Sequence, residues 1–258
     1  MAAQNPRFLV ITGDGINCER ETAAALRLAG AAADILHIND LVAAPENMAR
    51  YDGLALPGGF SFGDELGSGQ IMALKLRYKL GDALRDFIAA QKPVIGICNG
   101  FQILVKLGLL PFPDQAARCL ALAPNSHGSF TDKWVTMTVQ KNNSPWLQGV
   151  EGRRITMPMR HGEGRIVLKD PALLAVLQEN GQMPLVYTED VNGSAGRIAA
   201  LTDPSGMILG MMPHPEAFVS QHTYRQPGHY GRGDGLMIFE NMVQHLKGQE
   251  TEHAKRRA

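Results

Sequence analysis

The sequence predicts an α/β fold of three layers, in which a largely parallel central sheet lies between flanking helices and a β-rich second half follows. Two observations predict it. Short apolar runs alternate with helical stretches as far as residue 107, which is typical of a parallel sheet covered by helices on both faces. Beyond about residue 110, strand-like segments follow one another closely. Nothing between the halves has the composition of a linker, so we expect a single domain over residues 7–246.

The first half begins with a buried strand. Arg7–Thr12 is a short apolar run that stops at the Gly-Asp-Gly sequence of residues 13–15, and it predicts a strand followed by a tight turn. Asn17 is expected to cap an Ala-rich helix over residues 18–29, which Gly30 ends. The other strands expected in this half are 34–38, 53–56 and 93–97, and the other helices are 69–80, 82–90 and 100–107.

The second half is expected to be mainly strand. Residues 134–140 alternate between apolar and polar side chains, as a half-exposed strand does. A helix is predicted over residues 235–246 from apolar side chains at i, i+4 and i+8. The polar stretch 221–234 is expected to be a long surface loop, and the tail 247–258, which lacks large apolar residues, is expected to fray. The other expected strands are 165–168, 185–187, 198–202 and 207–211.

The composition excludes several classes of protein. Lys plus Arg and Asp plus Glu are 25 each, a balance that argues against nucleic acid as the main ligand. No apolar run is long enough to cross a membrane, and no signal peptide is expected. The three cysteines have no CxxC spacing, so neither a disulfide framework nor a common zinc motif is expected. A reducing cytoplasm is the expected location.

The strongest chemical signal lies in residues 94–102, VIGICNGFQ. An apolar strand runs through Gly-x-Cys-x-Gly into a helix, which is the thiol form of a nucleophile elbow. The flanking glycines leave room for the tight turn, and the positive end of the helix favours the thiolate of Cys98. The alternative is a buried core cysteine. The two glycines and the strand-to-helix context favour a reactive Cys98.

The second signal is MPHPE at residues 212–216. Pro215 holds His214 extended, and positions i and i+2 of an extended segment face the same way. Glu216 can therefore accept a proton from Nδ1 of His214 and leave Nε2 free to take the proton of Cys98. The alternative is a surface histidine beside a solvated glutamate. Taken alone, the motif favours neither the catalytic nor the surface interpretation. Its pairing with the cysteine elbow favours the catalytic one.

The third signal is LPGGFSFGD at residues 56–64, again at the end of a strand. Two consecutive glycines allow backbone N–H groups to point at an oxyanion, although a plain turn has the same sequence. The carboxyl ends of parallel strands meet at one edge of a sheet. We therefore expect Gly59, Cys98 and His214 to lie together.

Other chemistry-bearing residues are given structural roles. The turn at residues 13–15 lacks the third glycine of a dinucleotide fingerprint, so it is predicted to be a turn and a cap only. Cys18 and Cys119 are expected to be structural. His222 and His229 lie in a loop without metal-ligand spacing, so no metal site is expected.

Together, LPGG, GICNGFQ and PHPE resemble the triad-type, or class I, glutamine amidotransferase family. The resemblance extends over about residues 8–246 and implies a flavodoxin-like three-layer fold. FSFGD, GICNGFQIL and the RHGEGR sequence of residues 160–165 look most like the members that act in purine biosynthesis.

The resemblance implies a role for each matching residue. Cys98 would attack the side-chain amide of glutamine, giving a glutamyl thioester and ammonia. His214 would act as base and acid, and Glu216 would orient it. The backbone N–H groups of Gly59 and Asn99 would hold the oxyanion.

The same resemblance implies a glutamine-binding role for Gln102, together with backbone of His161, Gly162 and the residues that follow them. His161 is equally well read as a satisfied loop histidine. At residues 65–69 the chain departs from the family's Tyr-Leu-Arg-type stretch, which leaves details of the glutamine site open.

The family implies a place in a complex. Ammonia would pass to a large synthetase subunit, often with a small accessory subunit, which aminates formylglycinamide ribonucleotide. No cofactor or metal is expected in this chain, since ATP and Mg²⁺ would be bound by the synthetase. Two alternatives stay open, a glutaminase for a carbamoyl phosphate, GMP, CTP or anthranilate synthetase, and a non-catalytic binding module.

Overall fold

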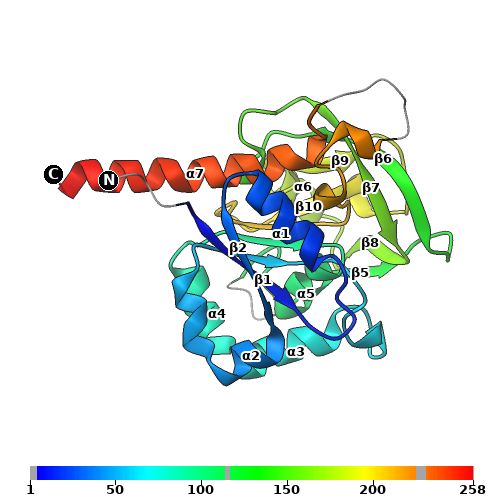
Figure 1. The fold of residues 1–258 in the computed structure, drawn as a ribbon. Helices are drawn as coiled ribbons and strands as arrows, with labels where there is room; N and C mark the ends of the chain where they lie inside the picture. The colour runs from blue at the N-terminus through cyan, green and yellow to red at the C-terminus, as the bar shows by residue number, and fades with distance from the viewer. Residues whose placement is uncertain (1–4, 114–116, 225–230, 258) are drawn as a thin grey trace.

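The computed structural model describes residues 5–113, 117–224 and 231–257, and their strands form one large sheet and one small one (Figure 1). The large sheet has the order β2-β1-β3-β4-β11-β10-β9-β6-β7 in these residues. Its strands are β1 (Arg7–Thr12), β2 (Ala32–His37), β3 (Gly53–Leu56), β4 (Val94–Ile97), β6 (Thr131–Val139), β7 (Arg154–His161), β9 (Leu185–Tyr187), β10 (Ile198–Thr202) and β11 (Ile208–Met211). The small sheet pairs β5 (Leu120–Pro124) with β8 (Glu163–Leu168) in antiparallel register.

The large sheet is parallel in its first half and antiparallel in its second. Strands β2, β1, β3, β4 and β11 pair in parallel, and each pairing from β11 through β10, β9 and β6 to β7 is antiparallel. This confirms the expected α/β class with a β-rich second half. Because β1, β3, β4 and β11 run the same way, the loops at their carboxyl ends meet at one edge of the sheet.

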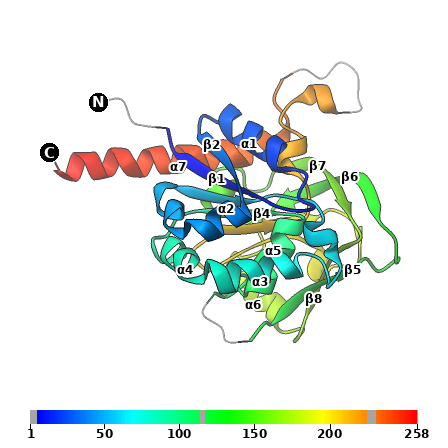
Figure 2. The same ribbon diagram turned by 60° about the horizontal axis from the view of Figure 1, so that its bottom comes forward.

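Helices cover both faces of the parallel half. The helices are α1 (Glu19–Leu28), α2 (Ile38–Ala43), α3 (Gln70–Lys79), α4 (Gly81–Ala89), α5 (Asn99–Leu107), α6 (Leu173–Glu179) and α7 (Asp234–Arg257). Helices α1 and α7 lie on one face, and α3, α4 and α5 lie on the other (Figures 1 and 2). All residues of β3, β4 and β11 are buried, as two-sided coverage requires.

Several element boundaries differ from expectation. Helix α1 begins at Glu19, with Cys18 at the N-cap and no side-chain cap, so the predicted cap by Asn17 is wrong. The second strand ends at His37, whose ring accepts a bond from the Asn39 N–H and caps α2. The segment from Lys247, expected to fray, continues α7 as helix to Arg257. Its Gln, Glu, Ala, Lys and Arg residues are good helix formers, which explains the continuation.

The predicted long loop can be compared only in part. Gln221–Thr223 forms a single 3-10 turn, whereas residues 225–230, including His229, lie outside the described residues. Strand β7 was not predicted because Pro158 interrupts its pattern. A proline is tolerated there because β7 is an edge strand of the sheet.

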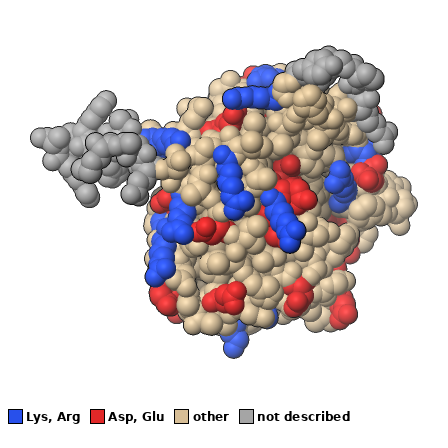
Figure 3. All heavy atoms as spheres, in the orientation of Figure 1, with Lys and Arg blue, Asp and Glu red and all other residues tan. Residues whose placement is uncertain are grey.

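The surface has no dominant charge on the face that Figure 3 shows, where Lys and Arg are interspersed with Asp and Glu. This distribution agrees with equal numbers of basic and acidic residues in the chain. Among the described helices, none combines the length and apolar character that crossing a bilayer requires.

Candidate active site

The turn between β4 and α5 holds Cys98 in a strained conformation. Its backbone has φ 52° and ψ −105°, a region that residues with a Cβ rarely adopt. The glycines on either side are sterically required. A Cβ on Gly96 would stand 2.6 Å from the carbonyl oxygen of Gly100, and one on Gly100 would overlap the carbonyl oxygen of Leu56. The sequence Gly-x-Cys-x-Gly therefore folds as the sharp elbow it predicts.

The elbow is anchored to the neighbouring strand. The backbone N–H of Cys98 donates to the carbonyl oxygen of Met211 at 2.7 Å, which ties the nucleophile candidate to the end of β11. The thiol contacts the carbonyl oxygen of Arg160 at 3.5 Å. Only 7% of Cys98 is exposed, so its sulfur lies in a sheltered position at the carboxyl edge of the sheet.

His214 and Glu216 follow β11 and face each other. Nδ1 of His214 lies 2.6 Å from Oε1 of Glu216, and both side chains are buried. The backbone N–H of His214 donates to the carbonyl oxygen of Pro158 at 2.8 Å, which fixes the segment against β7. Within the described residues, Nε2 of His214 and Oε2 of Glu216 have no hydrogen-bond partner.

The pKa of His214 reflects two opposing influences. Burial disfavours the imidazolium, but the charges of Glu216 and Cys98 outweigh burial and raise the pKa of His214 well above its ordinary value. The imidazole is therefore a strong proton acceptor, and the side chain of Cys98 interacts with it.

Gly58 is the point at which these groups converge. A Cβ placed on Gly58 would lie 2.8 Å from Cε1 of His214, 3.5 Å from Cβ of Cys98 and 3.4 Å from Sγ of Cys18. A Cβ cannot lie 2.8 Å from a ring carbon without a steric clash. A glycine at this position therefore gives the imidazole the space that it occupies beside the cysteine elbow.

The next glycine offers a backbone donor. Gly59 has φ 147°, and it pairs with Ile16 in an antiparallel bridge whose bonds run through Gly58 and Phe60. Its own N–H therefore has no partner among the described residues, and the N–H of Asn99, at the start of α5, has none either. Two unused donors at this edge of the sheet are suited to an oxyanion.

A side-chain network joins the FSFGD loop to α5. The amide of Asn99 accepts from the N–H of Ser61 at 3.3 Å and donates to Asp64 at 3.1 Å and to Gln102 at 3.0 Å. Gln102 in turn donates to the carbonyl oxygen of Glu163 at 2.5 Å. Both ends of the Gln102 amide are thus engaged with the protein, and this residue holds the Glu163 backbone next to the elbow.

His161 does not lie in a loop, and its ring is not hydrogen-bonded to the described part of the protein. It ends β7, it is buried, and its two ring nitrogens have no hydrogen-bond partner in the described part of the chain. Burial first, and then the charges of His214 and His127, lower the pKa of His161 to about 4. A neutral imidazole with two unused nitrogens is suited to contact a polar ligand. Gly162, which follows it, accepts from the N–H of Asn125 at 2.8 Å.

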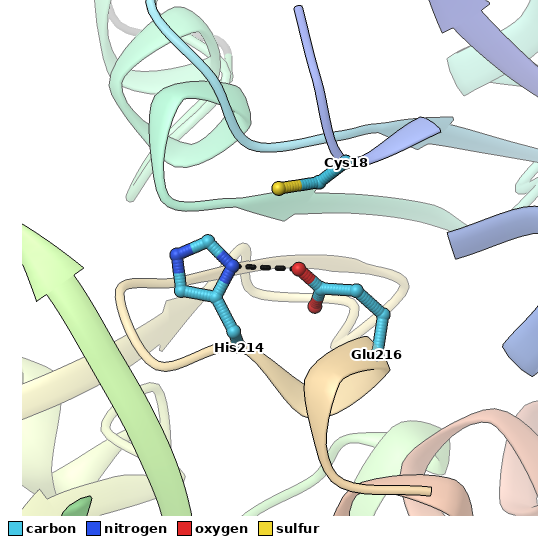
Figure 4. Close-up of side chains that lie close together, drawn as sticks. All are labelled: Cys18, His214 and Glu216. Carbon is cyan, nitrogen blue, oxygen red and sulfur yellow. Dashed lines mark hydrogen bonds and ion pairs between the residues drawn. The ribbon is translucent and has the colours of Figure 1, made fainter. Parts of the chain in front are cut away.

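Cys18 lies beside the candidate site, which sequence reasoning did not predict. It was expected to be structural, yet its Sγ, a ring nitrogen of His214 and a carboxylate oxygen of Glu216 all lie within 4.8 Å of one another (Figure 4). The sequence does contain a signal for it. Cys18 follows the carboxyl end of β1, a parallel strand of the same sheet, and therefore belongs to the same edge.

A parallel sheet with a cysteine elbow and a His–Glu pair at its carboxyl edge defines the class of thiol-dependent amidotransferases. The chain belongs to the CobB/CobQ-like glutamine amidotransferase domain family, whose model matches residues 5–246.

Individual relatives are similar over almost the whole chain. The phosphoribosylformylglycinamidine synthase subunit PurQ of Methanococcus maripaludis strain C5 is 41% identical, and the alignment covers 93% of this chain and 98% of the relative. The subunit of the same name from Dehalococcoides mccartyi is 37% identical over 92% and 96% of the two chains. Among solved structures, a chain of PurLQS from Thermotoga maritima matches with a TM-score of 0.77 at 34% identity, over 94% of this chain and 100% of that one.

Proposed function

We propose that this chain is the glutaminase subunit of a phosphoribosylformylglycinamidine synthase. It hydrolyses glutamine to glutamate and ammonia and supplies the ammonia for amination of formylglycinamide ribonucleotide in purine biosynthesis. The single observation that carries the chemistry is that Cys98 and His214 converge around Gly58, with Glu216 bonded to the far side of the imidazole. The near full-length similarity to PurQ subunits supports the choice of acceptor.

The reaction begins with proton transfer and attack. His214 takes the proton of Cys98 through Nε2, and the sulfur attacks the side-chain carbonyl carbon of glutamine. His214 then gives that proton to the leaving amide nitrogen. The carbon–nitrogen bond breaks, ammonia leaves, and a glutamyl thioester remains on Cys98. His214 next takes a proton from water, which attacks the thioester carbon. The carbon–sulfur bond breaks, glutamate leaves, and His214 returns the proton to the sulfur of Cys98.

Neighbouring groups assist each step. The carboxylate of Glu216 holds the Nδ1 proton of His214, which fixes the tautomer and stabilises the imidazolium. The N–H groups of Gly59 and Asn99 receive the oxyanion. His161 contacts the polar groups of glutamine, while Gln102 acts by holding the backbone that continues from Gly162.

The partners follow from the same proposal. A large synthetase subunit receives the ammonia and carries ATP and Mg²⁺, and a small accessory subunit completes the complex. The similarity to one chain of PurLQS from Thermotoga maritima is consistent with such an assembly. This chain needs no cofactor of its own for glutamine hydrolysis, and we place the complex in the cytoplasm.

The test measures ammonia release from glutamine in the presence of the large subunit. We expect Cys98→Ser to lose at least about 10³-fold in rate, because a hydroxyl is a far weaker nucleophile than a thiol. Cys119→Ser is the matched control and retains the wild-type rate. If Cys98→Ser hydrolysed glutamine as fast as the wild type, the mechanism would be wrong. Stimulation by a different synthetase only would exclude the proposed acceptor.

A further inference from the structure

Cys18 takes no part in the proposed glutaminase steps, although it lies beside two residues that do. It occupies the N-cap of α1, and its Sγ, a ring nitrogen of His214 and a carboxylate oxygen of Glu216 are within 4.8 Å of one another (Figure 4). The thiol donates to the side-chain oxygen of its neighbour Asn17 at 3.2 Å.

Two polar atoms of His214 and Glu216 are buried and unpaired in the described part of the chain. Oε2 of Glu216 and Nε2 of His214 have no hydrogen-bond partner within the described residues, and only 4% and 3% of the two residues are exposed. Buried polar atoms are nearly always paired, so an unpaired one needs a physical explanation, and a bound ion is one. The reaction itself uses Nε2, whereas Oε2 of Glu216 has no function in it.

The charges of the cluster match a divalent cation. A thiolate and a carboxylate together supply two negative charges, and the imidazole of His214 supplies a nitrogen once the metal displaces its proton. Sulfur, nitrogen and carboxylate oxygen are the ligands that Zn²⁺ takes in proteins, with distances of about 2.0–2.3 Å to the metal. A buried dication with two anionic ligands leaves no uncompensated charge.

We propose that Cys18, His214 and Glu216 form an inhibitory binding site for a thiophilic divalent cation of the Zn²⁺ type. The proton balance explains the inhibition. The metal displaces the proton of the Cys18 thiol as the thiolate binds it. The metal also binds the Glu216 carboxylate and an imidazole nitrogen of His214. These groups can then no longer take the proton of Cys98, so Cys98 loses its base. Only the inhibition rests on the proposed function, whereas metal binding does not.

The experiment measures metal binding directly on the full chain kept reduced with a phosphine. Co²⁺ replaces Zn²⁺ as a spectroscopic probe, because a cobalt–thiolate bond gives a charge-transfer band. Zn²⁺ affinity is measured by competition with a chromophoric chelator. The variants are Cys18→Ser, Glu216→Gln and Cys98→Ser, with Cys119→Ser as the matched control and thermal unfolding without metal as the check on folding.

The expected result is one equivalent of metal and a charge-transfer band that Cys98→Ser and Cys119→Ser retain. Cys18→Ser is expected to lose the band, and both Cys18→Ser and Glu216→Gln are expected to bind Zn²⁺ at least about 10-fold more weakly. A band that persists in Cys18→Ser but is lost in Cys98→Ser would place the metal on the nucleophile instead and overturn the proposal. No band in the folded wild type would overturn it as well.

The two proposals fail separately. If both hold, Zn²⁺ is expected to abolish glutaminase activity in the wild type, reversibly with a chelator, and to inhibit Cys18→Ser at least about 10-fold more weakly. A chain that binds Co²⁺ through Cys18 but never hydrolyses glutamine would retain the metal site and contradict the proposed function.

Discussion

At the scale of single residues, the site depends on Gly58, which has no Cβ and so leaves room for the ring of His214. Gly58 lies where the imidazole of His214 and the elbow of Cys98 come together, and a Cβ there would stand 2.8 Å from the ring. Such a contact forces either the ring or the loop to move. Since misplacement of a reacting group by about 1 Å can cost about 10²-fold in rate, this glycine matters for chemistry more than for stability.

Gly58→Ala tests this point. We expect a loss of about 10²-fold in glutaminase rate, because the ring of His214 no longer reaches the thiol at the same angle. Gly248→Ala is the control, since a Cβ there meets no atom within 4 Å. Ammonia release in the complex is the measurement. A Gly58→Ala variant with the wild-type rate would contradict the assigned position of the imidazole.

His161 gives a prediction about pH. Its pKa is lowered to about 4, so the folded protein holds it neutral while the unfolded chain protonates it near pH 6.5. Stability is therefore lost as the pH falls from about 6.5 towards about 4, by about 3 kcal/mol at most. His161→Asn is expected to remove this part of the slope. Denaturant unfolding between pH 7 and 4 measures it.

The partly exposed His245 provides the control for that measurement. His245→Gln is expected to keep most of the wild-type dependence on pH, because its ring reaches solvent. An unchanged slope in His161→Asn would mean that the ring of His161 is not held neutral by burial.

The proposed catalytic residues could be predicted from the sequence, whereas the residues packed around them could not. Cys98, His214 and Glu216 were predicted because each stands in a local pattern, a glycine-flanked elbow or a proline-held i, i+2 pair. The proximity of Cys18 to His214 and the buried, unpaired ring of His161 were not predicted. Both depend on contacts between segments far apart in the chain, which no local pattern contains.

At the scale of elements, the β4–α5 elbow stores conformational strain at the nucleophile. Cys98 has φ 52° and ψ −105°, which costs a residue with a Cβ about 1–3 kcal/mol. The surrounding structure maintains it through the Cys98 N–H bond to Met211 and the close packing of Gly100 on Leu56. The strain is thus linked to the position of the sulfur at the carboxyl edge of the sheet.

Comparison of Cys98→Gly with Cys98→Ala measures this strain. Glycine adopts the conformation freely, so we expect Cys98→Gly to be more stable than Cys98→Ala by about 1 kcal/mol, after the greater entropy of the unfolded glycine chain is subtracted. The exposed helical Ala89 gives the control, where Ala89→Gly should instead lower the free energy of unfolding. If glycine were less stable than alanine at position 98 as well as at position 89, by the free energy of unfolding, position 98 would be unstrained.

The elements themselves were predictable where a pattern was strong. The strands 53–56, 185–187 and 198–202 have the expected bounds, and β1 does as well. The strands β5 and β7 were not predicted, since β7 contains Pro158 and lies at an edge where hydrophobic alternation is weak. The tail of α7 was misread because polarity was taken as a sign of fraying, although its residues favour helix.

At the scale of the whole molecule, the two halves of the sheet meet at the proposed active site. The parallel half supplies the elbow and the Gly58 loop, whereas the antiparallel half supplies the backbone of β7 against which His214 is fixed through Pro158. The order of strands in the sheet was not predictable, because pairing between β9, β6 and β7 depends on long-range contacts. The sequence did predict that strand ends would gather the candidate residues.

The most direct test of the central claim is covalent labelling by an electrophilic glutamine analogue in the complex with the large subunit. Peptide mapping by mass spectrometry then identifies the modified sulfur. We predict one equivalent of label on Cys98, none on Cys18 or Cys119, and competition by glutamine. Label on Cys18 in place of Cys98, or no label on a chain that binds the large subunit, would contradict the account.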